Sequence, residues 1–356
     1  MSVKIAARMP TFATADEVTD AARAALPDEV WEYVNGGAGT EVVLRRNRAA
    51  LDALLLRGRV LRNVSSVRTD TTFLGIPLAS PVLLAPIGTI GLFDSGGAAS
   101  CARAAARAGS AAFISILSTP SLEEVAAAAP DAALVYQHYI RGDRGWTLEL
   151  VRRAEAAGYR ALCLTVDSPV DGLRERELRL RFDRGAAQAQ PNLVGARREL
   201  QAAVTWDEVA WLADETALPL VLKGITHPGD AARAIEAGAA AIVVSNHGGR
   251  QLDPQPGAIE VLAEVVEAAG ALEVAVDGGF VRGNDVVKAL ALGARAVLIG
   301  RALCLSLAAG GEDALVETLR RLRVETERTL ALLGVTCAGE VAATHVIRAD
   351  WATPPR

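Results

Sequence analysis

Short apolar runs rich in β-branched residues recur along most of the chain, and an alanine-rich stretch with helical spacing follows each of them. Glycine, proline or aspartate bounds these runs. The alternation predicts βα units, whose strands lie parallel in one sheet. Eight runs have this character, and eight strands are the number that closes a parallel barrel. The expected strands are residues 82–85, 112–116, 133–136, 161–166, 218–222, 240–244, 273–276 and 296–299.

Helical patterns fill the gaps between these strands and extend beyond them. Patterns over residues 28–34 and 41–56 predict a cap on the bottom or side of the barrel, and 313–333 predicts a long terminal helix. We therefore expect an α/β fold, a TIM (β/α)₈ barrel with an N-terminal helical cap and a C-terminal helix. It would form a single domain over residues 1–356, with the barrel at about 82–310. Between the strands, alanine-rich segments that end at glycine predict helices over 98–108, 148–157, 230–237 and 284–292.

The gap between the fourth and fifth expected strands is the widest. It contains residues 185–195, which are rich in glycine, alanine, glutamine and proline. A long stretch of this composition beside a barrel mouth predicts a mobile lid.

Composition and charge narrow the class of protein and of partner. Hydrophobic residues make up 51% of the chain and charged residues 22%, which is typical of a globular protein with a substantial core. A formal net charge of -5 gives no long-range attraction to nucleic acid or to an anionic membrane, so we expect a small-molecule partner. The 4 cysteines form no C-x-x-C pair, and we expect no metal. Without a signal-like start or an apolar run of about 18 residues, we expect a cytoplasmic protein with no membrane insertion.

Polar and small residues directly follow the apolar runs, which is where a TIM barrel carries its active site. The segments DGGFVRGND and LIGRA have the glycines and helix starts that favour phosphate binding, with tight turns as the alternative. Lys223 would neutralise negative charge on a bound group such as a reduced flavin or form a Schiff base, with a solvated lysine as the alternative. In chain order the strand-end residues are Pro86, Ile87, Gly88, Ser115, Gln137, Tyr139, Thr165, Asp167, Lys223, Ser245, Asn246, His247, Asp277, Gly278, Gly279, Gly300 and Arg301.

The segment SNHGGRQLD, residues 245–253, carries the most informative chemistry. It places His247 just after a strand end, next to glycines, with Arg250 three positions further on. An imidazole takes up a proton near neutral pH, and a guanidinium binds a carboxylate through two hydrogen bonds. Asp167 could orient this histidine from across the barrel mouth, with a turn aspartate before a proline as the alternative. Arg174 lies in a run of arginines and glutamates whose spacing alone indicates a solvated face.

Together these motifs resemble the FMN-dependent α-hydroxy acid oxidase and dehydrogenase family, which includes glycolate oxidase, lactate oxidase and mandelate dehydrogenase. The similarity extends from about residue 26 to 307 in the family order, and SNHGGRQLD is highly specific. It implies a (β/α)₈ barrel, FMN as cofactor, a 2-hydroxy acid as substrate and a homotetramer. The matching segments are LPDEVWEYVNGGAGTE, STPSLEEVA, YQHY, LTVDSP, LPLVLKG, IVVSNHGGRQLD, VDGGFVRG and KALALGARAVLIGR.

The resemblance also implies roles for individual residues. His247 corresponds to the family's base, paired with Asp167, and would remove a proton from an L-2-hydroxy acid while flavin N5 accepts the α-hydrogen. The product would be the 2-oxo acid, and oxygen or another acceptor would reoxidise the flavin. The implied substrate contacts are Tyr33, Tyr139, Arg174, His247 and Arg250. The implied FMN contacts are Pro86, Ile87, Gly88, Ser115, Gln137, Thr165, Lys223, Ser245, Asp277, Gly278, Gly279, Arg282, Gly300 and Arg301.

The chain departs from the family at three informative positions. Val281 replaces a usual phosphate-binding arginine, and Arg282, one position later, is the expected substitute. Leu117 and Gly88 stand where glycolate oxidase has Trp and Ala, which predicts a larger substrate side chain, branched or aromatic. Two other functions stay open. An FMN-dependent isomerase would not need the arginine and histidine clamp, and a non-catalytic FMN-binding barrel would be expected to lose the base or Tyr139.

Overall fold

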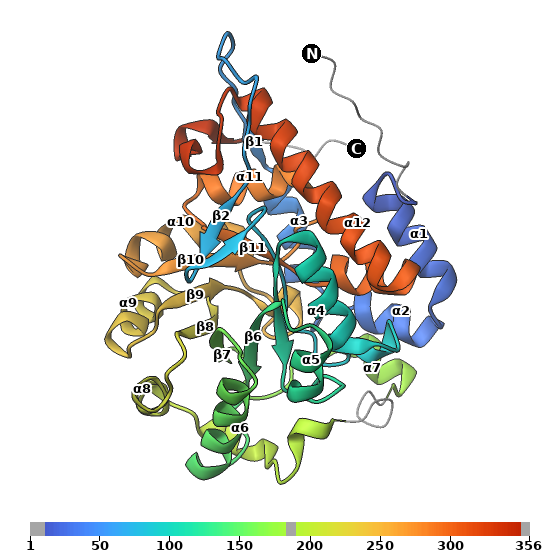
Figure 1. The fold of residues 1–356 in the computed structure, drawn as a ribbon, viewed down its shortest axis with the longest axis vertical. Helices are drawn as coiled ribbons and strands as arrows, with labels where there is room; N and C mark the ends of the chain where they lie inside the picture. The colour runs from blue at the N-terminus through green and yellow to red at the C-terminus, as the bar shows by residue number, and fades with distance from the viewer. Residues whose placement is uncertain (1–10, 183–189, 350–356) are drawn as a thin grey trace.

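Eight parallel strands form a closed barrel at the centre of the computed structural model, which describes residues 11–182 and 190–349 (Figure 1). Neighbouring strands follow the chain order, and the barrel closes where Val297 of the last strand pairs with Val82 of the first. Every expected strand is present, so the predicted TIM barrel is confirmed. The strands are β4 (Val82–Leu84), β5 (Ala111–Ser115), β6 (Ala133–His138), β7 (Ala161–Thr165), β8 (Leu220–Ile225), β9 (Ala241–Val244), β10 (Glu273–Asp277) and β11 (Ala296–Ile299).

Strand β8 extends further than its apolar run predicts. Its pairing with β9 is irregular between Lys223 and Ile225, and Gly224 at that irregularity has a φ of +110°. A Cβ at Gly224 would lie 2.6 Å from the Cβ of Asp167, so the strand passes this aspartate only because glycine has no side chain. Lysine and glycine interrupt the apolar pattern here, which is why the pattern ends early.

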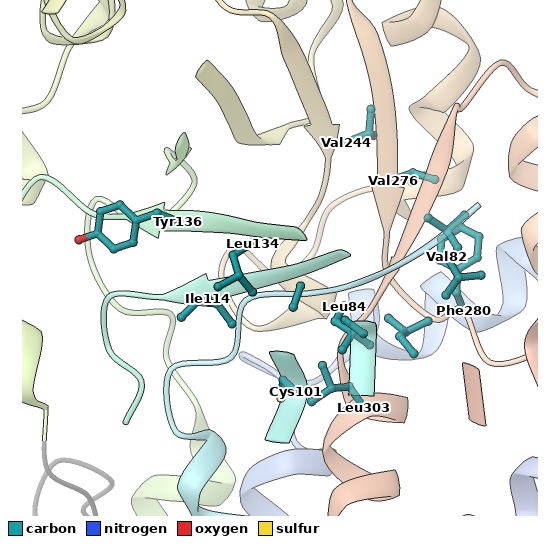
Figure 2. Close-up of a cluster of buried hydrophobic side chains, with 14 of the residues drawn as sticks. Val82, Leu84, Cys101, Ile114, Leu134, Tyr136, Val244, Val276, Phe280 and Leu303 are labelled. Atoms are coloured by element: carbon teal, nitrogen blue, oxygen red, sulfur yellow. The ribbon is translucent and has the colours of Figure 1, made fainter. Parts of the chain in front are cut away.

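Helices surround the barrel and bury the outward faces of its strands (Figure 1). The four helices expected between strands are all present, with ends shifted by a few residues. Figure 2 shows part of the core between barrel and helices, where Leu84 lies near Cys101 of one helix and Leu303 of another. The helices that follow the strands are α4 (Gly97–Ala108), α5 (Leu122–Ala128), α6 (Arg144–Ala156), α7 (Glu175–Leu180), α8 (Trp206–Glu215), α9 (Pro228–Glu236), α10 (Ala258–Ala269), α11 (Gly283–Ala291) and α12 (Arg301–Leu333).

The interior of the barrel is closed at its N-terminal end by a hairpin that the periodicity did not predict. Its strands are β2 (Thr71–Phe73) and β3 (Ile76–Leu78). Three of their side chains, Phe73, Ile76 and Leu78, are buried in one cluster with residues of the barrel interior. Strands of three residues are too short to show an alternation of their own.

Three helices precede the barrel: α1 (Ala15–Ala25), α2 (Asp28–Asn35) and α3 (Val42–Asp52). The sequence pattern did not predict α1, which packs on α12. Helices α2 and α3 were expected on the bottom or side of the barrel, but they contact the loop that follows β9, at the C-terminal face. The guanidinium of Arg250 donates to the carbonyl of Tyr33, and the amides of Asn47 and Asn246 bond each other at 2.8 and 2.9 Å. Amphipathic spacing shows that a helix has a buried face but does not show which surface covers it.

Helix α3 is also shorter than expected, because residues 54–56 form a strand. This strand, β1 (Leu54–Leu56), pairs with β12 (Val346–Arg348), which lies close to the end of the described chain. The last helix, α12, begins directly after β11 and is broken at Gly310 and Gly311. Its second part is the predicted terminal helix, and α12 as a whole packs on α1, α4 and α11. Within residues 11–182 and 190–349, no helix has the length and apolar character needed to cross a membrane.

The segment expected to form a lid is only partly described, since residues 183–189 lie outside the described residues. Its later part is attached to the barrel. Asn192 is buried, and its side chain bonds the carbonyl of Ile116 and the N–H of Leu122. The indole of Trp146 donates to the carbonyl of Val194 at 2.9 Å. The remaining 3-10 helices are η1 (Ile90–Leu92), η2 (Pro191–Leu193), η3 (Arg198–Ala203), η4 (His247–Gly249), η5 (Ala338–Glu340) and η6 (Ala343–His345).

Candidate active site

A cavity of about 610 Å³ opens at the C-terminal ends of the barrel strands. That volume lies in the usual range for a cofactor and substrate site. Four other candidates do not line this cavity: Asp167, Gln137, Thr165 and Ser245. Asp167 and Ser245 bond the lining residues His247 and Lys223, whereas Thr165 lines a second pocket. The candidates that line the cavity are Tyr33, Pro86, Ile87, Gly88, Ser115, Tyr139, Arg174, Lys223, His247, Arg250, Asp277, Gly278, Gly279, Gly300 and Arg301.

His247 and Asp167 form a hydrogen-bonded pair at the mouth of the barrel. The Nδ1 atom of His247 lies 3.0 and 3.2 Å from the two carboxylate oxygens, and the Ser168 hydroxyl donates to the same carboxylate at 2.9 Å. Burial of Asp167 raises its pKa, but His247 and Lys223 lower the pKa more, so the carboxylate stays ionised. An ionised carboxylate only accepts, so Nδ1 carries the hydrogen and Nε2 is left as the basic nitrogen.

The backbone at His247 is in the left-handed region, with a φ of +55°. This conformation is uncommon outside glycine and costs about 1–3 kcal/mol. It is held by a hydrogen bond from the His247 N–H to the Ser245 hydroxyl at 3.0 Å and by the glycines at 248 and 249. The loop after β9 is therefore specialised to turn this side chain into the cavity.

Lys223 is a buried cation with defined partners. Its ammonium group donates to the Ser245 hydroxyl at 2.9 Å and lies 3.1 Å from Asp277. Burial lowers the pKa of Lys223, but the carboxylates of Asp277 and Asp167 raise it above its usual range. A lysine held in the protonated form is a fixed positive charge and a poor nucleophile, which disfavours the Schiff-base alternative.

Arg174 and Arg250 converge on one carboxylate that the sequence did not single out. Glu177 accepts a hydrogen bond from Arg250 at 2.8 Å and lies 3.6 Å from Arg174. The Arg174 Nε donates to the Arg250 carbonyl, and the Arg250 guanidinium lies 4.8 Å from the ring centroid of Tyr33. Glu177 was hidden because it belongs to a charged run that resembles a solvated face. Its position one helical turn after Arg174 was the available signal.

Two candidate residues of the described chain have a buried oxygen without a hydrogen-bond partner: Thr165 at Oγ1 and Asp277 at Oδ1. Buried polar atoms are rarely left unpaired, so both are suited to polar groups of a bound molecule. Gly278 has a φ of +105°, and a Cβ there would lie 3.2 Å from the Asn47 amide, so the backbone here favours glycine. These features fit the polar ring edge and ribityl chain of FMN.

Arg301 and the start of α12 fit the phosphate end of the same molecule. The Arg301 guanidinium is partly buried and donates to three backbone carbonyls, of Val34, Gly36 and Gly248. Burial, with help from Arg250, lowers the pKa of Arg301 to about 10. Gly300 gives α12 no side-chain cap, so the helix presents backbone N–H groups at its start. A partly buried cation beside the N–H groups of a helix start suits an anion.

Arg282 does not join this group. Its side chain is half-exposed and lies 3.6 Å from Asp16, away from the cavity. Arg48 of α3 lines the cavity instead. It donates to the Gly279 carbonyl at 3.1 Å and to both oxygens of Asp285 at 2.8 Å, and thereby fixes the glycine loop. The sequence missed Arg48 because it did not place α3 over the C-terminal face.

Leu117 and Gly88 are packed against each other. A Cβ on Gly88 would lie 2.9 Å from the Cβ of Leu117, so the leucine occupies part of the space that glycine leaves. The enlargement expected from these two positions is therefore smaller than their sizes alone imply.

A closed (β/α)₈ barrel that combines a histidine and aspartate pair with a cavity of cofactor size and an N–H-lined helix start is typical of flavin-dependent barrel enzymes. The chain belongs to the family of FMN-dependent dehydrogenases, whose model matches residues 22–348. It is 42% identical over 352 residues to a peroxisomal (S)-2-hydroxy-acid oxidase of Oryza sativa subsp. japonica, covering 93% of this chain and 94% of the relative. It is 43% identical over 340 residues to an L-lactate oxidase of a Nostoc species, covering 89% and 93%.

Solved structures agree with this family. A mandelate oxidase with (S)-2-phenylpropionate superposes with a TM-score of 0.88 at 41% identity, covering 95% of this chain and 98% of that chain. An oxidized active mutant of (S)-mandelate dehydrogenase gives a TM-score of 0.90 at 34% identity, covering 94% and 99%. The expected resemblance and FMN as the cofactor are thus confirmed.

Proposed function

We propose that the protein oxidises an L-2-hydroxy acid to the 2-oxo acid, with FMN as the electron acceptor and His247 as the base. The observation that carries this proposal is the ionised Asp167 bonded to His247 Nδ1, which leaves Nε2 basic in the same cavity as two arginines. The relatives named as (S)-2-hydroxy-acid oxidase and L-lactate oxidase support the same reaction.

The substrate's carboxylate binds between Arg174 and Arg250, whose guanidinium groups Glu177 orients. This contact directs the α-carbon and its hydroxyl toward His247 Nε2 and the hydroxyl of Tyr139. His247 accepts a substrate proton, and Asp167 stabilises the imidazolium that forms. When bound, FMN supplies the acceptor for the α-hydrogen and two electrons.

Different residues would hold the ring, the ribityl chain and the phosphate of FMN. Lys223 offers a fixed positive charge beside the ring, where reduction creates negative charge. Thr165 and Asp277 offer their unpaired oxygens to the ring and ribityl chain, and Arg301 with the α12 start suits the phosphate. The other FMN contacts expected from the sequence are Pro86, Ile87, Gly88, Ser115, Gln137, Ser245, Gly278, Gly279 and Gly300.

Assembly and location are part of the same proposal. The family resemblance supports a homotetramer, and the composition of the chain supports a cytoplasmic location, whereas the rice relative is named as peroxisomal. The pairing of β1 with β12 supports one domain over residues 1–356.

The two alternatives are disfavoured by this set of side chains. Neither an isomerase nor a non-catalytic barrel needs an aspartate-oriented base facing an arginine pair. Incubation with an L-2-hydroxy acid and an artificial electron acceptor tests the proposal through its product. We expect one 2-oxo acid for every two electrons that the acceptor takes up. A rearranged hydroxy acid without acceptor reduction would establish the isomerase instead.

A further inference from the structure

One wall of the cavity is polar, in contrast to the apolar wall at Leu117. It is built by the loops after β6 and β7 and by η3. Two of its charged residues, Asp171 and Arg198, form an ion pair that is partly exposed at the mouth. The polar residues that line this wall are Arg141, Ser168, Asp171, Gln190, Arg198 and Gln201.

Arg141 is held in this wall by several contacts. Its Nε donates to the Gln201 side-chain oxygen at 2.7 Å, and its guanidinium carbon lies 5.0 Å from the ring centroid of Tyr139. Gln201 is only 8% exposed, and its amide group donates to the Ser168 carbonyl. The Arg197 N–H also bonds the Arg141 carbonyl, which joins the two loops. Stacking and hydrogen bonding together preorganise the guanidinium.

This arginine is close to the proposed reacting centre. Gln201 bonds Ser168, and the Ser168 hydroxyl bonds Asp167, the partner of the base. The ring that supports Arg141 belongs to Tyr139, whose hydroxyl is proposed to contact the substrate. A substrate held at its carboxylate by the two clamp arginines therefore has a short path for its side chain toward Arg141.

We propose that Arg141 binds a second anionic group at the end of the substrate's side chain, so that the preferred substrates are 2-hydroxy diacids. The inference rests on the proposed function and specifies its substrate class. An alkyl side chain placed against this wall would cover the charged guanidinium of Arg141 and offer it no acceptor. A carboxylate would add a charge-assisted contact with the planar guanidinium. The polar wall thus favours a charged end over the branched or aromatic side chain expected from Leu117 and Gly88.

Matched substrates of similar shape test this proposal. L-malate has a terminal carboxylate where L-2-hydroxyisocaproate has an isopropyl group. The amide of L-malate is polar but uncharged, so it distinguishes an effect of charge from an effect of polarity. We expect kcat/KM to favour L-malate over L-2-hydroxyisocaproate by at least about tenfold, the effect of one charge-assisted contact, with the amide between them. Arg141→Met should lower that ratio by at least about tenfold, and Arg141→Lys should retain an intermediate ratio. Arg144→Met is the matched control, because Arg144 is exposed on α6 and stacks on Trp211 instead.

Binding of the products gives a second readout that does not depend on turnover. The change in flavin absorbance reports the Kd of the 2-oxo diacid, and this Kd should rise in Arg141→Met while that of the 2-oxo alkyl acid changes less. A higher kcat/KM for the alkyl acid, or a ratio that Arg141→Met leaves unchanged, would overturn the proposal. Either of these contradicting results can be measured only if a hydroxy acid reduces the flavin. If the proposed function itself is wrong, neither acid reduces the flavin, so the two failures can be told apart.

Discussion

Replacement of Asp167 by Asn removes the negative charge behind the proposed base and keeps the size of the side chain. Its two carboxylate oxygens lie 3.0 and 3.2 Å from His247 Nδ1, which has a single hydrogen to donate. The variant therefore loses one charge-assisted hydrogen bond, worth about 1.5–3 kcal/mol. Because this bond strengthens as the imidazole becomes cationic, the loss affects the transition state. The rate of flavin reduction should fall by about 10- to 150-fold.

The assay is anaerobic stopped-flow reduction of the bound flavin at saturating substrate, which isolates chemistry from the acceptor step. Asp207→Asn is the control, since Asp207 is exposed in the first turn of α8 and does not line the cavity. Both variants should carry a full complement of FMN. If Asp167→Asn with full FMN is reduced within about twofold of the wild-type rate, the base is not oriented or stabilised by this aspartate.

Three further changes test other parts of the account. Gly88→Ala should lower kcat/KM about tenfold by crowding Leu117, and adding Leu117→Ala should restore most of it; additive losses would show that the two side chains are independent. In titrations of apoprotein, Arg282→Ala should change the Kd of FMN by less than about twofold, because Arg282 points away from the cavity. Val281→Arg should lower this Kd about tenfold. A higher Kd in Arg282→Ala would show that this arginine contacts the phosphate. Burial raises the pKa of Glu312, but its two arginine partners lower this pKa more, so it lies below the ordinary value of 4.5. The ionised carboxylate therefore stabilises the fold at any pH above 4.5, and this stabilisation is lost as the pH falls below that value. The Tm of Glu312→Gln should therefore fall less between neutral and acid pH than the Tm of the wild-type protein. If the two proteins lose Tm equally as the pH falls, Glu312 does not contribute to the acid sensitivity.

The barrel could be predicted because its strands are buried on both faces and so appear as continuous apolar runs. The polar residues that end those runs must meet at one face of a parallel barrel, which is how His247 and Lys223 were found. Functional side chains on elements outside the βα repeat could not be predicted in this way. Arg48 and Glu177 lie on helices whose position on the barrel depends on tertiary contacts, and their own sequence context indicates only charged helical surfaces.

Pairings between distant segments were also hidden. The partner of β1 is near the other end of the chain, and neither three-residue strand has a periodicity that reveals the other. Placement of α3 on the C-terminal face depends on the buried contact between Asn47 and Asn246, which no local pattern encodes. The polar wall around Arg141 was missed for the same reason, since η3 meets the loop after β6 only in the folded chain.

The central claim is that an L-2-hydroxy acid reduces the bound FMN directly, with His247 as the base. Anaerobic mixing of wild-type protein and His247→Ala with L- and D-2-hydroxy acids tests it most directly, with the flavin absorbance as the signal. We expect the L isomers alone to bleach the wild-type flavin, and His247→Ala to bind FMN but react at least about 100-fold more slowly. Bleaching of the variant at the wild-type rate, or no bleaching of the wild-type protein by any of the acids, would contradict the account.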